Sequence, residues 1–124
     1  MDPVLVVDDD HDWTEALDAY FEMLGIPVVV AHDGREALRQ LRGGLRPSVI
    51  VLDLEMPSMS GISFRFGQLA EQNGSSIPLL VCSGVREGAA TAELLGAAAF
   101  LPKPVPPRQL VAKVRELSGS AAAS

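Results

Sequence analysis

Five short apolar runs are separated along the chain by longer segments in which apolar residues recur every three or four positions. A continuous apolar run bounded by turn residues is typical of a buried strand, and the longer spacing is typical of an amphipathic helix. Since helices separate the strands, the pattern predicts parallel βαβ units with right-handed crossovers. The strands are expected over residues 4–7, 27–30, 48–54, 77–83 and 98–103.

Two of the amphipathic segments begin with helix-start signals. Asp12 followed by Glu15 fits a capping box, in which the first side chain accepts a backbone N–H and the second reaches back. Asp33 and Glu36 repeat this spacing, and Gly25 suits the end of the first helix because glycine readily adopts the left-handed conformation. These helices are expected over residues 12–24 and 32–44.

The other three expected helices lack a common start signal and are predicted from different features. Ile62, Phe66 and Leu69 predict a third helix. Gly67 weakens this helix, which is expected to end near Gly74. The last two are an alanine-rich helix through Leu94 and Leu95 to Gly96, and one that starts at Pro106 and Pro107 and carries Leu110, Val111, Val114 and Leu117. Proline suits a helix start because the N–H that it lacks would have no partner there.

The length of the chain bounds its organisation. A chain of 124 residues is one domain with a sizeable core. We expect the domain to cover residues 1–117, and the stretch "SGSAAAS" at 118–124 to be a flexible tail or the start of a linker. Hydrophobic residues make up 48% and charged residues 21%, as in ordinary soluble domains.

The net charge and the cysteine content indicate which partners the chain can bind and in which compartment it works. The net charge of −6 disfavours direct binding to nucleic acid or to an anionic membrane. Because no apolar run approaches the roughly 20 residues that span a bilayer, and no signal-peptide pattern is present, we expect no membrane insertion. Cys82 is the single cysteine, so no internal disulfide can form, and a reducing, cytoplasmic compartment is expected.

Polar residues that carry chemistry stand where the expected strands end. The chain alternates strand and helix throughout, which predicts an α/β fold with a doubly wound parallel sheet, and such sheets bind ligands at the carboxyl ends of their strands. The first strand ends in Asp8, Asp9 and Asp10, and the later strands end in Asp53, Ser83 and Lys103. All of these side chains are therefore expected on one rim of the sheet.

This rim is acidic where nucleotide-binding folds are rich in glycine. An acidic loop repels a bare phosphate, but clustered carboxylates suit a hard divalent cation, above all Mg²⁺. Such a cation would neutralise a phosphoryl group. Asp53 is then the natural nucleophile and would form an acyl phosphate. Lys103 would add a second positive charge and Ser83 a hydroxyl donor, which together favour phosphoryl transfer.

Four stretches, "VLVVDDD", "VIVLDLEMPSMSG", "LLVCSG" and "AFLPKP", occur in this order and spacing. Together they resemble the receiver domain of two-component response regulators, and the resemblance covers roughly Pro3 to Leu117. The combination of an acid pair, an acceptor Asp before Met-Pro, a hydroxyl residue and Lys-Pro is highly specific. The resemblance implies a five-stranded, flavodoxin-like (βα)5 fold like that of the chemotaxis regulators, with strand order 2-1-3-4-5.

The resemblance also implies a role for each matching residue. Asp53 matches the phosphoacceptor, and Lys103 and Ser83 match the two residues that assist phosphoryl transfer to it. Ser83 also matches the switch hydroxyl and Phe100 the aromatic that changes rotamer. The metal ligands implied for Mg²⁺, with Mn²⁺ as an alternative ion, are Asp8, Asp9, Asp53 and the backbone carbonyl of Glu55. A cis Lys103–Pro104 bond is also implied.

The implied function is that of a signalling switch and not of a turnover enzyme. A sensor histidine kinase or a histidine phosphotransfer protein would donate the phosphoryl group to Asp53, and the domain would slowly hydrolyse its own aspartyl phosphate. The added charge would draw Ser83 and Lys103 inward and let Phe100 turn in. Helix 4, strand 5 and helix 5 would then present a different surface to an output protein or domain.

Four positions depart from the usual pattern of the family. Ser60 stands where an Asp is common, which would affect a turn more than the chemistry. Glu55 places an acid beside the phosphoryl site and would alter the phosphoryl lifetime, and Phe100 replaces a frequent Tyr. Pro102 interrupts the fifth strand, which is tolerated at a sheet edge because no ladder hydrogen bond is lost there.

Two other functions remain as alternatives. The first is a phosphatase of the phosphoaspartyl class, whose D-x-D-x-T motif would require an Asp and a Thr where this chain has Glu55 and Pro57. The second is a receiver-like interaction module that works without phosphorylation. Such modules usually lose an acid or the lysine, and this chain keeps both.

Several polar and aromatic residues are given structural interpretations. Asp10 and Asp12 are expected as helix caps, and Trp13 as packing of the first helix near the rim. His11 and His32 are expected at the surface because neither has a partner at metal-ligand spacing. Cys82 is expected to be a small buried strand residue.

Overall fold

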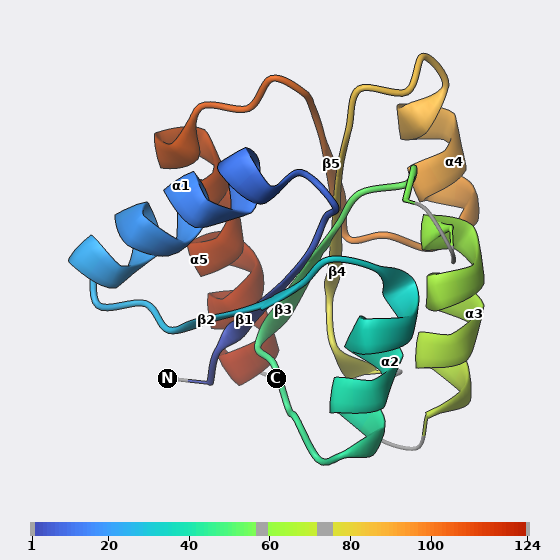
Figure 1. Ribbon diagram of the computed structural model, residues 1–124, viewed down its shortest axis with the longest axis horizontal. Coiled ribbons are helices and arrows are strands. Elements are labelled where there is room, and N and C mark those ends of the chain that lie inside the picture. The colour runs from blue at the N-terminus through green and yellow to red at the C-terminus, as the bar shows by residue number, and fades with distance from the viewer. Residues whose placement is uncertain (1, 57–59, 72–75, 124) are drawn as a thin grey trace.

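The computed structural model describes residues 2–56, 60–71 and 76–123, and within them strands and helices alternate as the sequence predicts. Figure 1 shows a central sheet with helices on both sides. The elements in chain order are β1 (Val4–Val7), α1 (His11–Met23), β2 (Val28–Ala31), α2 (Gly34–Arg42), β3 (Val49–Leu52), α3 (Gly61–Ala70), β4 (Leu79–Ser83), α4 (Gly88–Leu94), β5 (Ala99–Pro102) and α5 (Pro107–Ala123).

The five strands form one parallel sheet in the order β2-β1-β3-β4-β5, which confirms the predicted fold class and strand order. Val4 pairs with Val28 on one side and with Val49 on the other, so β1 lies in the interior of the sheet. β5 is an edge strand, where Pro102 is accommodated opposite Ser83 without loss of an interior hydrogen bond.

Two hydrophobic cores lie on the two faces of the sheet because alternate strand residues point to opposite faces. Val4 and Val6 of β1 belong to one core, which α1 and α5 cover. Leu5 and Val7 belong to the other, which α2, α3 and α4 cover (Figure 1). Burial on both faces explains why the strands are continuous apolar runs.

α1 begins at His11, one residue before the expected start at residue 12. Of the two residues expected as caps, Asp10 is the N-cap, as predicted, and its Oδ1 accepts the backbone N–H of Trp13 at 3.1 Å, whereas the capping box at Asp12 is wrong. A carboxylate one residue before the helix reaches the third helical N–H, whereas Asp12 is already inside the first turn. The cap of α2 is confirmed, since Asp33 Oδ1 accepts the Glu36 N–H at 2.8 Å. Gly25 has a φ of 76° after α1, also as predicted.

The apolar spacing correctly predicts α3, but Ile62, Phe66 and Leu69 do not form its buried face. They are 42%, 69% and 44% exposed, and Phe64, Arg65 and Gln68 are buried instead. Gly67 faces α2, where a Cβ would lie 2.6 Å from Leu38 Cδ1. The close approach of α2 and α3 through this glycine selects the buried face. The helix ends at Ala70, and Gly74, near which its end was expected, lies outside the described residues.

The last helix continues beyond the expected domain end. α5 runs from Pro107 to Ala123, so residues 118–123 are helical where a flexible tail or linker is expected. The boundary at residue 117 itself stays a prediction. Within the described part of the chain, no helix combines the length and the apolar character needed to cross a membrane.

Candidate functional site

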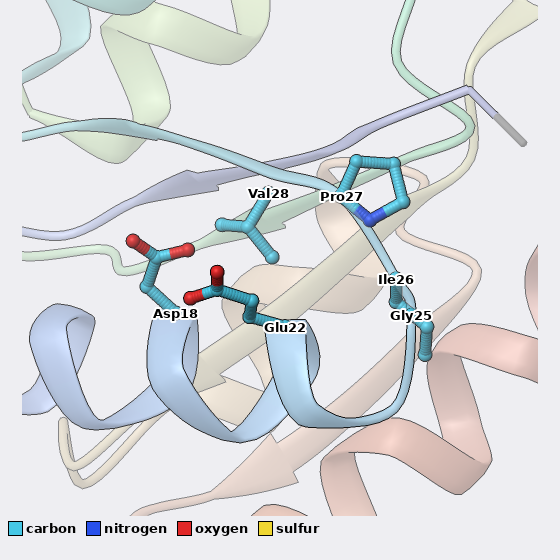
Figure 2. A pocket seen from close by; sticks show the side chains of 6 residues that line it. All are labelled: Asp18, Glu22, Gly25, Ile26, Pro27 and Val28. Atoms are coloured by element: carbon cyan, nitrogen blue, oxygen red, sulfur yellow. The ribbon is translucent and has the colours of Figure 1, made fainter.

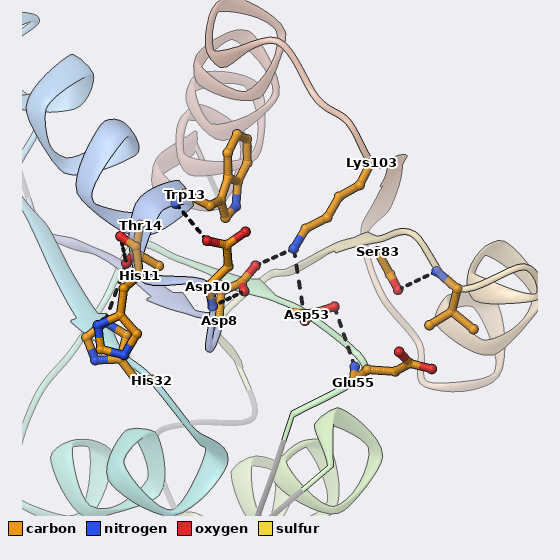
Figure 3. A network of polar contacts seen from close by, with 11 residues as sticks. Asp8, Asp10, His11, Trp13, Thr14, His32, Asp53, Glu55, Ser83 and Lys103 are labelled. Carbon is orange, nitrogen blue, oxygen red and sulfur yellow. Dashed lines mark hydrogen bonds and ion pairs between the residues drawn. The ribbon is translucent and has the colours of Figure 1, made fainter.

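The polar residues expected on one rim lie at the carboxyl end of the sheet (Figure 3). Asp8 and Asp53 directly follow β1 and β3, Ser83 is the last residue of β4, and Lys103 directly follows β5. The sheet hydrogen bonding continues into both acids, because Asp8 N–H donates to Ala31 O and Asp53 N–H donates to Val7 O, each at 3.0 Å. The strand register therefore sets the spacing between the two carboxylates.

Three carboxylates converge at this rim. Asp8, Asp9 and Asp53 each place one oxygen within 4.8 Å of the others. Asp8 and Asp53 are 3% and 8% exposed, whereas Asp9 lies open to solvent. Burying two like charges is costly unless a cation compensates them. An all-oxygen donor set with an open side fits a hard divalent cation that keeps some of its water.

Lys103 supplies a cation to the same cluster from β5. Its Nζ donates to Asp8 Oδ2 at 2.5 Å and lies 4.0 Å from Asp53 Oδ2. Burial lowers the pKa of Lys103, but the hydrogen bond and charge of Asp8, together with the charge of Asp53, outweigh it and raise the pKa above its usual value. Lys103 therefore carries its charge throughout the physiological pH range.

The pKa of the Asp53 carboxyl group is strongly raised. Burial raises its pKa to about 6, against the lowering effect of Lys103, while the charges of Asp8 and Asp9 raise it further. The Glu55 N–H approaches Asp53 Oδ1 at 3.5 Å and lowers the pKa. At neutral pH Asp53 is thus predominantly an ionised, poorly solvated carboxylate, a state that suits a nucleophile.

The other expected residues lie on the β4 and β5 side of Asp53. Ser83 is buried, and its Oγ accepts the Val85 N–H at 3.1 Å. Glu55 is exposed, so its carboxylate points away from the buried carboxylates. Half-buried Phe100 packs against the start of α4, where a Cβ on Gly88 would lie 2.9 Å from Phe100 Cε1. The Lys103–Pro104 bond is cis, which confirms that expectation.

Ser60, which departs from the family pattern, has a local role in α3. Its Oγ accepts the Ser63 N–H at 3.2 Å and caps the helix. Cys82 is buried in β4 as expected, and burial raises the pKa of its thiol to about 12. A thiol in this environment stays protonated and unreactive. Neither residue therefore adds to the chemistry of the rim.

Sequence reasoning missed two contacts beside the rim. Lys103 Nζ lies over the ring of Trp13, 5.8 Å from its centroid, and the two residues line a pocket of about 300 Å³ with Asp10, Pro104 and Val105. The rings of His11 and His32 stack at 3.8 Å between centroids. His11 is exposed as expected and His32 is half-buried. Both contacts join residues far apart in sequence, so no local pattern signals them.

A wider hollow of about 550 Å³ lies away from the rim (Figure 2). Asp18 and Glu22 of α1 line it together with the turn into β2, which comprises Gly25, Ile26, Pro27 and Val28. Pro27 and Val28 stand at the amino end of β2, the opposite end from Asp8 and Asp53. The hollow is therefore separate from the carboxylate cluster.

The model of one protein family matches this chain over residues 4–115, and its description is the response regulator receiver domain. The Escherichia coli transcriptional regulatory protein CpxR is 35% identical over 117 residues, which cover 94% of this chain and 49% of CpxR. The Mycobacterium tuberculosis transcriptional regulatory protein PrrA is 39% identical over 115 residues, covering 92% of this chain and 48% of PrrA. The chain thus spans about half the length of these relatives.

Solved structures show the same fold. The receiver domain of a Francisella response regulator superposes with a TM-score of 0.83 at 32% identity, covering 97% of this chain and 98% of that domain. The receiver domain of a Pseudomonas aeruginosa sensor histidine kinase, solved with a magnesium ion coordinated in its active site cleft, gives 0.86 at 23% identity. That likeness covers 95% of this chain and 98% of that domain, and supports the fold alone.

Proposed function

The chain belongs to the response regulator receiver family, and from that premise we propose that Asp53 is its phosphoacceptor. As a receiver domain it is a phosphoacceptor of two-component signalling and not a turnover enzyme on external substrates. The observation that carries the assignment to Asp53 is its place among Asp8, Asp9 and Lys103. Asp53 combines burial, a pKa raised to about 6 and a lysine ammonium 4.0 Å away.

The proposed reaction transfers a phosphoryl group to a carboxylate oxygen of Asp53. This oxygen attacks the phosphorus of a phosphohistidine, a P–O bond forms, and the P–N bond breaks with its electron pair leaving on the imidazole nitrogen. Asp8, Asp9, Asp53 and the Glu55 carbonyl would hold Mg²⁺, or alternatively Mn²⁺. When bound there, the cation neutralises charge on the phosphoryl oxygens.

Lys103 and Ser83 are proposed to stabilise the transferred group. Lys103 now donates to Asp8, one of the proposed metal ligands, and lies 4.0 Å from Asp53 Oδ2, so it is placed to move toward a phosphoryl oxygen near Asp53. Ser83 uses its oxygen as an acceptor for Val85 N–H, which leaves the hydroxyl hydrogen for donation. Together they would balance the developing charge beside the buried carboxylates of Asp8 and Asp53.

We propose that the signal leaves the site through Phe100. Its ring lies against Gly88, and Gly88 in turn lies close to Ser83, so movement of Ser83 changes the space beside the ring. A change in this packing would alter the surface of α4, β5 and α5 that meets an output protein or domain. Glu55, exposed beside Asp53, is placed to influence the water that slowly hydrolyses the aspartyl phosphate.

The donor and output partners are also proposals. Receiver domains interact with histidine kinases and output domains, and CpxR is a transcriptional regulator. We propose a sensor histidine kinase or histidine phosphotransfer protein as the donor, in a cytoplasmic setting. An interaction module independent of phosphorylation is not favoured, because the acid cluster and Lys103 are both intact. The phosphatase alternative is disfavoured because Glu55 stands where its motif requires an Asp and Pro57, which lies outside the described residues, stands where it requires a Thr.

Intact-mass spectrometry after incubation with acetyl phosphate tests the proposal directly. Wild type should gain the mass of one phosphoryl group only when Mg²⁺ is present, and Asp53→Asn should gain none. Asp12→Asn is the matched control, since it removes an exposed acid of α1 outside the cluster and should react like wild type. An adduct that persists in Asp53→Asn would assign the acceptor to another residue.

A further inference from the structure

Lys103 is held within a closed ring of contacts at the rim (Figure 3). Its Nζ donates to Asp8 Oδ2, and Asp8 Oδ1 accepts the Asp10 N–H at 3.0 Å. Asp10 Oδ1 accepts the Trp13 N–H, and the Trp13 ring lies 5.8 Å from Lys103 Nζ. The lysine ammonium therefore contacts both a carboxylate and an aromatic ring.

The position of Trp13 is determined by the loop that carries the metal-binding acids. The Asp10 side chain caps α1 through the Trp13 N–H, and the Asp10 carbonyl accepts the Thr14 N–H at 3.0 Å. The first turn of α1 is thereby attached to the residue next to Asp9. Since Asp8 continues the sheet, the Trp13 ring stands at a defined place relative to the carboxylate cluster.

Hydrogen bonding by the indole does not explain why a tryptophan occupies this position. Among the described residues, the buried Trp13 Nε1 has no hydrogen-bond partner. A buried donor without an acceptor opposes folding, and buried tryptophans usually find one. The interactions that favour Trp13 are therefore its apolar packing beside α5 and the contact of its π face with the Lys103 ammonium.

We propose that Trp13 is a positioning residue for Lys103, a role that rests on the phosphoacceptor function proposed above. A lysine side chain is flexible, and the ring restricts the volume that its ammonium can explore. The ring attracts the cation without accepting its hydrogens in a fixed direction, so Lys103 can move from Asp8 to a phosphoryl oxygen along the ring. A carboxylate in place of the Trp13 ring would instead compete with the phosphoryl group for the Lys103 ammonium.

The first test compares phosphorylation rates at saturating acetyl phosphate and Mg²⁺. Trp13→Leu keeps an apolar side chain but removes the π face, and should slow the reaction about two- to thirtyfold, the range of a cation–π contact. Trp13→Phe restores a π face and should recover most of the rate. Mg²⁺ affinity should not change, because Asp8, Asp9 and Asp53 remain. Tyr20→Leu removes another half-buried ring of α1 that packs on the same core, and should react like wild type.

A rate in Trp13→Leu equal to that of wild type would overturn the proposal. It would equally be overturned if Trp13→Phe or Tyr20→Leu were as slow as Trp13→Leu, because loss of packing would then explain the effect. Thermal unfolding of each variant verifies that the compared proteins are folded. A wild type that takes up no phosphoryl group would refute the phosphoacceptor function, and the contact would then be judged by the second test.

The second test needs neither donor nor metal. Lys103 and Lys113 are the two lysines of the chain, so amine acylation at fixed pH followed by peptide mass spectrometry gives their reactivity ratio. Lys113 pairs with Glu116 on α5 and serves as the internal reference. The Lys103 to Lys113 ratio should rise several-fold in Trp13→Leu, and should stay near the wild-type value in Trp13→Phe and Tyr20→Leu. An unchanged ratio in Trp13→Leu would show that the ring does not restrain Lys103.

Discussion

The ring of Phe100 occupies the space that a side chain at Gly88 would need. A Cβ built on Gly88 would lie 2.9 Å from Phe100 Cε1, 3.1 Å from Phe100 Cζ and 3.6 Å from Ser83 Cβ. Carbon atoms this close repel, so the first residue of α4 has to be glycine for the ring to lie here. Phe100, the expected switch residue, is therefore packed directly against α4, whose surface it is proposed to change.

Gly88→Ala should therefore displace Phe100 and destabilise the domain by about 1 to 2 kcal/mol. Alanine has a higher helix propensity than glycine, but the cost of overpacking against the ring outweighs this gain. Gly119→Ala is the control, since a Cβ at Gly119 in α5 meets nothing within 4 Å. It should stabilise by about 0.5 to 1 kcal/mol. Urea unfolding gives both values, and aromatic NMR shifts report the Phe100 ring. Stabilisation by Gly88→Ala equal to that of Gly119→Ala would contradict the packing argument.

Asp53 should make the metal-free domain less stable as pH rises. Its pKa in the folded state is about 6, against 3.8 in the unfolded chain, so the folded state binds the proton more tightly. The contribution of Asp53 to the free energy of unfolding is then greatest below about pH 4, falls between pH 4 and 6, and stays low above that range. Asp53→Asn should remove this fall and be more stable than wild type at neutral pH by about 3 kcal/mol.

Urea unfolding in the presence of a chelator, at several pH values, measures this effect. Asp12→Asn changes an exposed acid and should keep the wild-type slope between pH 4 and 6. If Asp53→Asn showed the same slope as wild type, the source of the pH dependence would lie in another group.

Magnesium should stabilise the folded domain through the acid cluster. A ligand at about one hundred times its Kd adds about 2.7 kcal/mol to the free energy of unfolding. Asp9→Asn should lose most of this gain, since Asp9 is one of the three converging carboxylates, yet it should hardly change the metal-free stability because its side chain is exposed. Thermal unfolding with and without Mg²⁺ tests this, and Asp12→Asn should respond like wild type. An Mg²⁺ shift preserved in Asp9→Asn would remove Asp9 from the ligand set.

Arg65 should be important for the attachment of α4 to α3. Its Nε donates to Leu95 O at 2.9 Å, its Nη2 to Gly96 O at 3.3 Å and its Nη1 to Gln68 Oε1 at 2.9 Å. Burial lowers the pKa of this guanidinium, and Arg65 is only 8% exposed. Arg65→Met should cost about 2 to 3 kcal/mol, because these hydrogen bonds to a buried charged group would be lost.

The exposed Arg39 of α2 provides the matched control for that variant. Arg39→Met should change the free energy of unfolding by less than about 0.5 kcal/mol. Hydrogen exchange of α4 amides should accelerate in Arg65→Met and not in Arg39→Met. Equal stability of the two variants would show that Arg65 does not anchor α4.

The sequence by itself determined the order of strands and helices along the chain and which polar residues gather at the rim. Buried parallel strands must be apolar along their whole length, so runs such as Val4–Val7 are visible without a structure. Acids that directly follow such strands, as Asp8 and Asp53 do, must meet at the carboxyl end of a parallel sheet. Short-range signals were nearly as informative, although of the two expected caps of α1 only Asp10 caps the helix and Asp12 does not.

Only the tertiary structure decided which side chains meet across long sequence distances. Apolar spacing cannot tell which side of α3 is buried, because Gly67 and Leu38 settle that by the approach of α2. The pKa of Asp53 depends on burial and on Lys103, which the sheet brings from β5. The Trp13 ring reaches Lys103 because β1 and β5 belong to one sheet and end at the same rim, and Phe100 reaches Gly88 because α4 packs against β5. Local sequence encodes local preference, whereas these contacts arise from packing of elements far apart in the chain.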